Sequence, residues 1–314
     1  MPGPISRRMS GSKSVTQAVK SPSKRGGFLA AISEMPVMVK LALFWLVFIV
    51  TAAIYAQIDL LLNQALPLQD PFHQPFLFGE ASPVEGPSAD HVLGTDVLSR
   101  DNLSRLIHGA WVSLIVAVTV VAFGVVFGGF IGAFVGYVRG RSETVVMASL
   151  DVVLAFPPLV LLLALVSIYK VRNLTLIALV FGVLSIPTYV RIARASTLGI
   201  ASREFIQAAE AIGTKRRSIL FREIIPNIMP ALLAYALISA GFVIVIEGTL
   251  SYLGLSVQIP QPTWGNMINE GRRDIRRTIL PIFWPGLFLT LTVVSLNMLG
   301  DWVQQRVAVR SSAL

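Results

Sequence analysis

Two acidic residues, Asp151 and Glu247, lie within or at the edge of long apolar stretches of the sequence. A charge at bilayer depth costs at least ~2.5 kcal/mol, and such side chains usually face a bundle interior or a cavity. One or both are therefore candidates to line a polar path between helices. For Asp151, near an expected helix end, the alternative is an ion pair with Arg139 or Arg141 that only anchors the helix. Glu247 lies deeper and precedes Gly248, and both interpretations stay open for it.

The residue types of most catalytic and metal sites are missing or badly spaced. The chain has no cysteine, which excludes disulfides, thiolate metal sites and cysteine nucleophiles. His73, His91 and His108 are 18 and 17 residues apart, whereas metal sites more often show short spacings. No G-x-x-x-x-G-K-[ST] phosphate loop occurs, so ATP binding in that mode is not expected. We therefore predict no catalytic, cofactor-binding or metal-binding residue in this chain.

The composition is typical of a membrane protein. Apolar residues make up 54% of the chain and charged residues 14%, against about 25% charged in soluble domains. The net charge of +9 could indicate nucleic acid binding, but the basic residues fall between apolar stretches, so no nucleic acid is expected. A helix needs roughly 20 apolar residues to cross a bilayer core. Six stretches approach or exceed this length: Val37–Ala56, Trp111–Val138, Val145–Ile168, Leu174–Val190, Ile228–Leu250 and Leu280–Gly300.

The distribution of basic residues predicts the topology. With the N-terminus inside, 18 Lys and Arg fall on the cytoplasmic side and 8 outside, so both termini are predicted to be cytoplasmic. Four arginines between residues 272 and 277 do not fit this bias. The first apolar stretch is too long for a signal peptide and is expected to be retained. We predict a disordered basic tail at 1–34, a first transmembrane helix and extracytoplasmic segment at 35–110, a five-helix core at 111–302 and a C-terminal tail at 303–314.

Small residues and prolines mark special positions within the expected spans. Gly124, Gly128, Gly132 and Gly136 recur every four residues and so lie along one helix face, which allows close helix packing in lipid. That contact could be internal or lie between subunits, and internal packing is the default. The Pro157–Pro158 pair interrupts the third stretch. We expect a packing kink there rather than a transport site.

The gap between the fourth and fifth stretches, residues 191–226, is unusually long for a membrane protein loop. Within 201–212, Phe205, Ala208, Ala209 and Ile212 form one helical stripe. Gly213 then breaks the helix, and a second helix is predicted from Ile219 until Pro226 limits it. Such a helix–turn–helix could dock on another protein or lie on the membrane.

The same segment resembles the EAA loop of ABC importer permeases. The residues that carry the likeness are Glu204, Ala208, Ala209, Gly213 and Pro226. Gln207 stands where the family name implies Glu, Glu223 replaces a usual apolar residue and Ile225 replaces Leu. Glu204, one turn before Gln207, could supply the acid. The resemblance implies that this loop, with Gln207 included, forms a coupling helix seated in a groove of an ATPase subunit.

Further stretches resemble one branch of that family, the dipeptide and oligopeptide permeases of the OppC/DppC type. They are His91–Asp96, Ser99–Asp101 and Ser104–Ala110 before the second span, Asp151 with Leu154–Pro157, and Glu247 with Leu253–Leu255 and Gln261–Gly265. The likeness covers about residues 91–302. It implies a type I ABC importer permease fold, all-α, with six transmembrane helices and a cytoplasmic coupling helix.

The resemblance also implies a function. The chain is expected to be a non-catalytic permease subunit of an ATP-driven importer in the bacterial inner membrane, working by alternating access. Expected partners are a second permease chain, two ATPase subunits that bind ATP-Mg, an extracytoplasmic solute-binding protein and membrane lipid. Di- and oligopeptides are the commonest cargo, and nickel chelates, glutathione or sugars are alternatives. Asp151 and Glu247 are then candidates for the translocation path. An ion-coupled secondary transporter and a non-transporting membrane scaffold are the rival interpretations.

Overall fold

The computed structural model describes residues 32–62, 69–79, 84–169, 173–257 and 260–312. Most of the predicted tail at 1–34 therefore lies outside the described residues. Residues 1–36 and 37–314 form separate units, and the account below concerns the second. Among the described residues no strand forms beyond an isolated bridge between Thr95 and Asp101. The expected all-α fold is confirmed.

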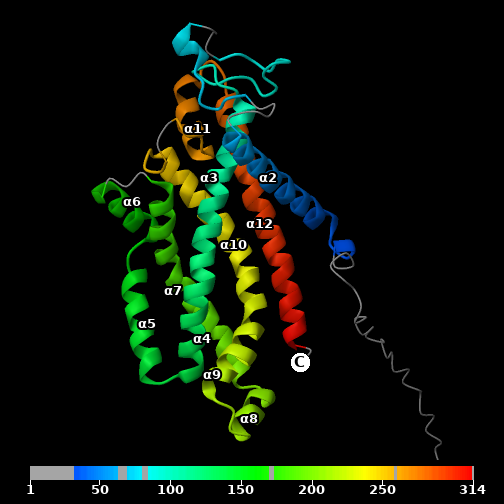
Figure 1. Ribbon diagram of the computed structural model, residues 1–314, viewed down its shortest axis with the longest axis vertical. Helices are drawn as coiled ribbons and strands as arrows, with labels where there is room; N and C mark the ends of the chain where they lie inside the picture. The colour runs from blue at the N-terminus through cyan, green and yellow to red at the C-terminus, as the bar shows by residue number, and fades with distance from the viewer. Residues whose placement is uncertain (1–31, 63–68, 80–83, 170–172, 258–259, 313–314) are drawn as a thin grey trace, which may run out of the picture. The chain divides into compact units, whose positions relative to one another are not determined.

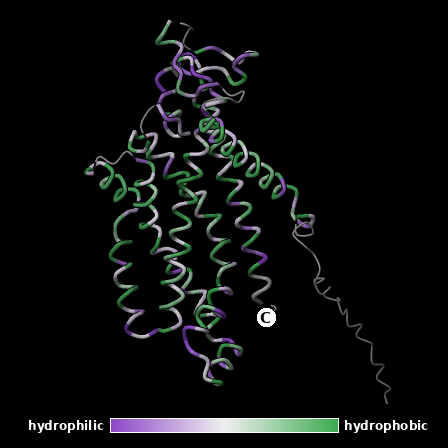
Figure 2. The backbone as a smooth tube through the Cα atoms, viewed as in Figure 1, coloured by the Kyte–Doolittle hydropathy of each residue, from purple (hydrophilic) through white to green (hydrophobic). Residues whose placement is uncertain are grey.

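Five helices are long and apolar enough to cross a membrane, and a bent helix pair makes a sixth if it counts as one span. The elements are α2 (Val37–Leu61), α3 (Asn102–Phe123), η2 (Gly124–Gly128), α4 (Gly129–Val138), α5 (Arg141–Leu154), α6 (Pro158–Tyr169), α7 (Leu174–Ala201), α8 (Glu204–Ala211), α9 (Arg216–Ile219), η3 (Leu220–Ile224), α10 (Ile225–Tyr252), α11 (Trp264–Gly271) and α12 (Leu280–Ser312). Figure 1 shows α8 and α9 at one end of the bundle and α11 at the other. Hydrophobic residues follow the long helices, and hydrophilic residues gather at the two ends (Figure 2).

Several helices extend beyond their predicted bounds, and three of the differences lie around the loop between the fourth and fifth spans. The fourth span does not stop at Val190, because α7 continues through Pro187 to Ala201. The second loop helix begins at Arg216, and Pro226 does not end it, since the helical path runs on from Arg216 to Tyr252. The π-helical turn η3 ends at Ile224, two residues before Pro226. Such a turn widens the backbone and is a common way to accommodate a break in α-helical hydrogen bonding.

The third span is broken rather than gently kinked. α5 and α6 meet at an angle of 71° across residues 155–157. Pro157 and Pro158 explain the break, because proline removes a helical donor and disfavours helix in the residue before it. α5 contains no buried residue, so it packs far less tightly than the other long helices.

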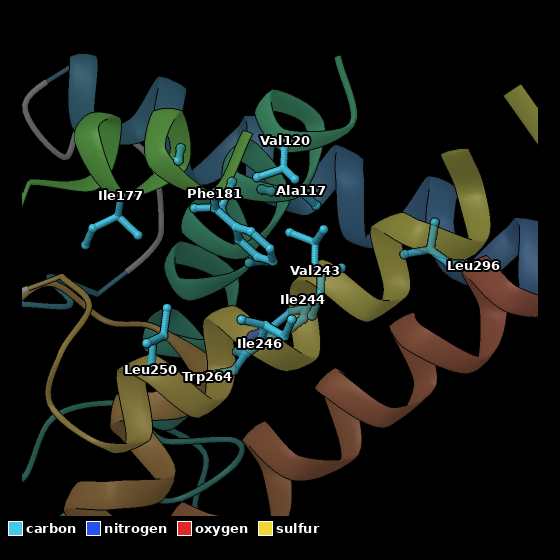
Figure 3. Packing of buried hydrophobic residues seen from close by; sticks show 14 of the residues in the cluster. Ala117, Val120, Ile177, Phe181, Val243, Ile244, Ile246, Leu250, Trp264 and Leu296 are labelled. Atoms are coloured by element: carbon cyan, nitrogen blue, oxygen red, sulfur yellow. The ribbon is translucent and has the colours of Figure 1, made fainter. Parts of the chain in front are cut away.

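Two apolar clusters hold the bundle together. The larger one draws on α2, α3, α6, α7, α10, α11 and α12 and includes Phe181, Ile244 and Trp264 (Figure 3). The smaller one joins α4, α7 and α10 to α8, α9 and η3, and contains Ile206 and Tyr189. The apolar side chains that remain exposed on the spans are those expected to meet lipid or another subunit.

The predicted glycine face packs inside the chain, against α7. A Cβ on Gly128 would lie 2.8 Å from the Ile186 carbonyl oxygen, and one on Gly132 would lie 2.4 Å from that of Val190. These distances leave no room for a side chain, so the glycines allow direct backbone contact between α7 and the η2–α4 segment. The default interpretation of internal packing is correct.

Candidate functional site

The α8 segment projects from the bundle as a short helix held by few side chains. Ile206 alone among its residues is buried, and it packs in the smaller apolar cluster with Ile219 of α9 and Ile224 of η3. Ala209 is half-buried against the same cluster. The Tyr137 hydroxyl donates to the Glu210 carboxylate at 2.9 Å and adds a link to α4. The remaining surface of α8 faces outward.

A glycine-dependent turn ends α8. Gly213 has φ +79°, a conformation that costs a residue with a Cβ roughly 1–2 kcal/mol. Its N–H donates to the Glu210 carbonyl at 3.0 Å, and the Thr214 N–H donates to the Ala209 carbonyl at 3.0 Å. These two bonds form a Schellman motif, which satisfies carbonyls at the end of the helix. The motif fixes the direction in which the chain leaves α8.

The predicted apolar stripe of α8 faces solvent. Phe205 is 42% exposed and Ile212 82%, with Ala208 exposed between them. Exposed apolar side chains in a row are typical of a surface that another protein covers. Of the predicted stripe, Ala209 instead turns partly toward the bundle.

The other predicted loop residues also lie at the surface. Glu204 is exposed in the first turn of α8. Gln207 is exposed, and its Nε2 donates to the Ser202 carbonyl at 3.2 Å. Pro226 is exposed at the start of α10, at the root of the loop. The structure thus brings Glu204, Gln207, Ala208 and Gly213 onto one projecting unit and leaves Pro226 outside it.

The two acidic candidates in the spans have different environments. Asp151 pairs with Arg191 of α7, not with Arg139 or Arg141, and its side chain is 60% exposed. Arginine reaches it from the neighbouring helix because α5 and α7 lie side by side, an arrangement that sequence distance does not reveal. A second pair, Arg194 with Glu143, joins the same two helices. The Asp151 and Arg191 charges are paired but remain open.

Glu247 is buried and surrounded by hydroxyl groups. It accepts hydrogen bonds from Ser251 at 2.6 Å and Ser113 at 2.9 Å, and from Ser256 at 3.2 Å. Because these serines lie on α10, α3 and the segment that follows α10, the carboxylate connects three parts of the chain. Its closed environment is typical of a structural polar cluster.

A buried ion network at the α11 end was not predicted from the sequence. Arg100 donates to Asp96 at 2.7 Å and to Glu270 at 2.7 Å, and Arg105 donates to Glu270 at 2.8 Å. Both arginines are about 1% exposed. Asp96, Arg100 and Arg105 lie in the sequence stretches that carry the family resemblance. Glu270, however, is 165 positions or more from either arginine, so no local spacing reveals the pairing.

The ion network helps to seat α11 against α3 and α10. Thr263 and Asn266 form a capping box at its start. The buried Trp264 donates from Nε1 to the Leu106 carbonyl at 3.0 Å. A Cβ on Gly265 would lie 2.2 Å from the Gly248 carbonyl oxygen, so α11 touches the α10 backbone directly. The α11 helix is therefore held by contacts on several sides.

Comparison with known proteins agrees with this architecture. Residues 124–312 match the family described as the inner membrane component of binding-protein-dependent transport systems. The chain is 34% identical over 217 residues to a glutathione transport system permease protein of Pectobacterium atrosepticum, covering 69% of this chain and 72% of the relative.

Two other relatives are named for the transport of dipeptides or tripeptides. The chain is 34% identical over 226 residues to a di/tripeptide transport system permease protein of Pseudomonas aeruginosa, which covers 72% of this chain and 74% of the relative. It is 32% identical over 229 residues to a dipeptide transport system permease protein of Alkalihalophilus pseudofirmus, covering 71% and 74%. The predicted permease resemblance is confirmed. This chain belongs to the family of inner membrane components of binding-protein-dependent transport systems.

Proposed function

We propose that this permease imports di- and oligopeptides as part of an ATP-driven transporter, and that α8 is the element that couples it to an ATPase subunit. Family membership supports import through a binding-protein-dependent system. The relatives named for dipeptides and di/tripeptides support the cargo. The observation that carries the coupling role is the exposed stripe of Phe205, Ala208 and Ile212 on a helix whose exit Gly213 fixes.

The proposal assigns an orientation and a set of partners. The α8 end faces the cytoplasm, in agreement with the bias of basic residues, and both termini lie on that side. Two ATPase subunits bind ATP-Mg, a second permease chain completes the path, and a solute-binding protein delivers cargo at the α11 end. ATP binding closes the ATPase pair, α8 moves with it, and the spans alternate their access.

Glutathione is the second candidate cargo, because a relative at the same level of identity is named for its transport. Cargo competition separates the two. Uptake of a labelled dipeptide by the intact transporter, unaffected by excess glutathione, supports the peptide proposal. Uptake of glutathione alone overturns it while leaving the coupling role of α8 intact.

The coupling role is tested with Gly213→Val. A Cβ at Gly213 meets no atom within 4 Å, so the change strains the positive φ without causing a clash. Gly199→Val in α7 is the matched control, because a Cβ there also meets nothing within 4 Å and its φ is not positive. We expect Gly213→Val to reach the membrane normally, to lose co-purification with the ATPase subunits and to abolish uptake. Gly199→Val should retain both properties.

Normal uptake by Gly213→Val contradicts the assignment of α8 as the coupling element. Loss of both variants from the membrane points to a folding defect, and Gly213→Ala then replaces Gly213→Val, because alanine strains the same φ with the smallest possible side chain. A permease that never co-purifies with an ATPase subunit favours an ion-coupled transporter or a scaffold.

A further inference from the structure

The Asp151–Arg191 pair differs from the other charged clusters of the bundle in its exposure. The Asp151 side chain is 60% exposed and that of Arg191 is 48% exposed. In the Asp96–Arg100–Arg105–Glu270 network no side chain exceeds 12%. The structural ion network is closed, whereas this pair can contact a third group.

The pair also lies within the candidate spans, away from the cytoplasmic-loop ends of α5 and α7. Asp151 is ten residues beyond Arg141, where α5 begins, and Arg191 is ten residues before Ala201, where α7 ends. At about 1.5 Å per residue, each lies about 15 Å from the end of its helix. Both positions fall within a helix, or a bent helix pair, that is long and apolar enough to cross a membrane. We do not expect exposed charges within such spans to face acyl chains, because charged residues within spans usually face a bundle interior or a water-filled cavity.

Helix packing does not account for the pair. α5 buries no side chain, so the pair is not held in place by a surrounding core. The neighbouring Arg194–Glu143 pair already ties α5 to α7, and it is less exposed, at 32% and 18%. The Arg194–Glu143 pair therefore links α5 to α7 independently, and the more exposed Asp151–Arg191 pair is accessible to a ligand.

We propose that Asp151 and Arg191 form a recognition station for zwitterionic cargo in the translocation path. The inference rests on the proposed import of peptides and narrows it to peptides with both termini free. The Arg191 guanidinium can donate two parallel hydrogen bonds to a carboxylate, and the Asp151 carboxylate can accept a hydrogen bond from an ammonium group. When cargo binds, each of its charged termini replaces one member of the Asp151–Arg191 pair. Every charge of the cargo and of the protein therefore keeps an oppositely charged partner as water is removed.

The neutrality of the pair suits transport. A single fixed charge within a span would hold an oppositely charged group tightly and slow its release. A pre-paired site binds a zwitterion only by giving up its own internal contact, which keeps the net affinity low. Conduction needs such weak sites, because the cargo must leave as well as enter.

The test uses cysteine labelling, since the chain contains no cysteine of its own. Ala195 is exposed one helical turn from Arg191 on the same face of α7. The intact transporter carrying Ala195→Cys is placed in lipid nanodiscs without nucleotide and treated with a membrane-impermeant, positively charged thiol reagent. Val47→Cys on α2, exposed in a span without nearby charges, is the lipid-facing control.

We expect the Ala195→Cys thiol to react about tenfold faster or more than the Val47→Cys thiol, as water access at a polar cavity implies. Alanyl-alanine should slow the reaction of Ala195→Cys severalfold, and N-acetyl-alanyl-alanine amide, which lacks both terminal charges, should not. Adding Arg191→Gln should remove the protection by alanyl-alanine. Adding Arg194→Gln, in the neighbouring pair, should preserve it.

Each opposite result overturns the inference. Equal reactivity of the two cysteines shows that the pair does not face water. Equal protection by both peptides, or by neither, shows that terminal charge is not recognised, and so does protection that survives Arg191→Gln. Protection is measured without uptake. If the transporter imports no peptide, the proposed cargo is wrong. If it imports peptides but alanyl-alanine does not protect Ala195→Cys, only the role of the Asp151–Arg191 pair is wrong.

Discussion

At the α11 end of the bundle, Arg100 and Arg105 are buried and meet Asp96 and Glu270 through bonds of 2.7–2.8 Å. At the α8 end, charged residues such as Glu204 stay exposed, and a single buried side chain, Ile206, anchors the helix. Both ends carry a short helix of eight residues between two spans. The two helices differ in their contacts. Many buried contacts within the chain hold α11, whereas few hold α8.

Glycine has a different role at each end. Gly265 of α11 permits a backbone contact that any Cβ would block, whereas Gly213 after α8 has open space and a positive φ. One glycine is required for packing and the other for chain direction. We infer that the α11 end is a fixed structural joint, while the α8 end is shaped to be completed by a partner.

Removing Glu270 tests the fixed joint with the largest expected effect. Glu270→Ala leaves two buried arginines without one of their acceptors, and breaking a buried ion pair in this way typically costs about 3–5 kcal/mol. We expect a large fall in the thermal unfolding temperature of the purified protein in detergent.

The matched control is Glu210→Ala at the α8 end. Glu210 is exposed, and its carboxylate accepts a hydrogen bond from the Tyr137 hydroxyl, so its loss should cost less than about 1 kcal/mol. Similar unfolding temperatures for the two variants contradict the contrast between the ends.

Adding one methyl group sharpens the comparison of the glycines. Gly265→Ala forces a Cβ against the Gly248 carbonyl, and overpacking of this kind typically costs about 1–3 kcal/mol of unfolding free energy. Gly199→Ala near the α8 end has open space and should be neutral or slightly stabilising, because alanine favours helix over glycine. Thermal unfolding of the two variants side by side measures the difference. A stable Gly265→Ala protein contradicts the close seat of α11.

The long apolar helices could be predicted from the sequence because length and hydropathy are local properties. Five of the six predicted spans appear as helices of sufficient length, and the sixth appears as the α5–α6 pair. The ends of α7 and α10 could not be predicted, because Pro187 and Pro226 read locally as breaks. In the structure Pro187 is buried within α7, and the π-helical turn η3 leads into α10, whose first turn contains Pro226.

The candidate sites divide in the same way. The α8 loop could be found from its stripe and from Gly213, since both signals lie within residues 205–213. The partner of Asp151 could not, because Arg191 lies 40 positions away on another helix. The Glu270 network is more distant still. Long-range ion pairs depend on which helices become neighbours, and periodicity does not encode that information.

The exposed stripe of α8 gives a third test, of intermediate size. Ile212→Ser removes the most exposed apolar side chain of the stripe and should leave the unfolding temperature unchanged. Under the proposed docking it should weaken ATPase binding about tenfold, which corresponds to about 1.4 kcal/mol. Ile206→Ser, at the buried position of the same helix, should instead destabilise the loop. A binding assay with the purified ATPase subunit separates the two variants. Unchanged binding by Ile212→Ser contradicts docking through this stripe.

The smallest expected effect concerns the acid of the coupling loop. Gln207 donates from its amide to the Ser202 carbonyl, a bond that glutamate cannot make, and it lies three residues from Glu204. Gln207→Glu therefore loses one exposed hydrogen bond and gains a like-charge neighbour, a change of about 0.2–0.5 kcal/mol. If Glu204 supplies the acid, Glu204→Gln weakens ATPase binding more than Gln207→Glu alters it. The same binding assay measures both. A strong gain in affinity for Gln207→Glu would show that the acid belongs at position 207 and that the α8 surface of this chain is incomplete without it.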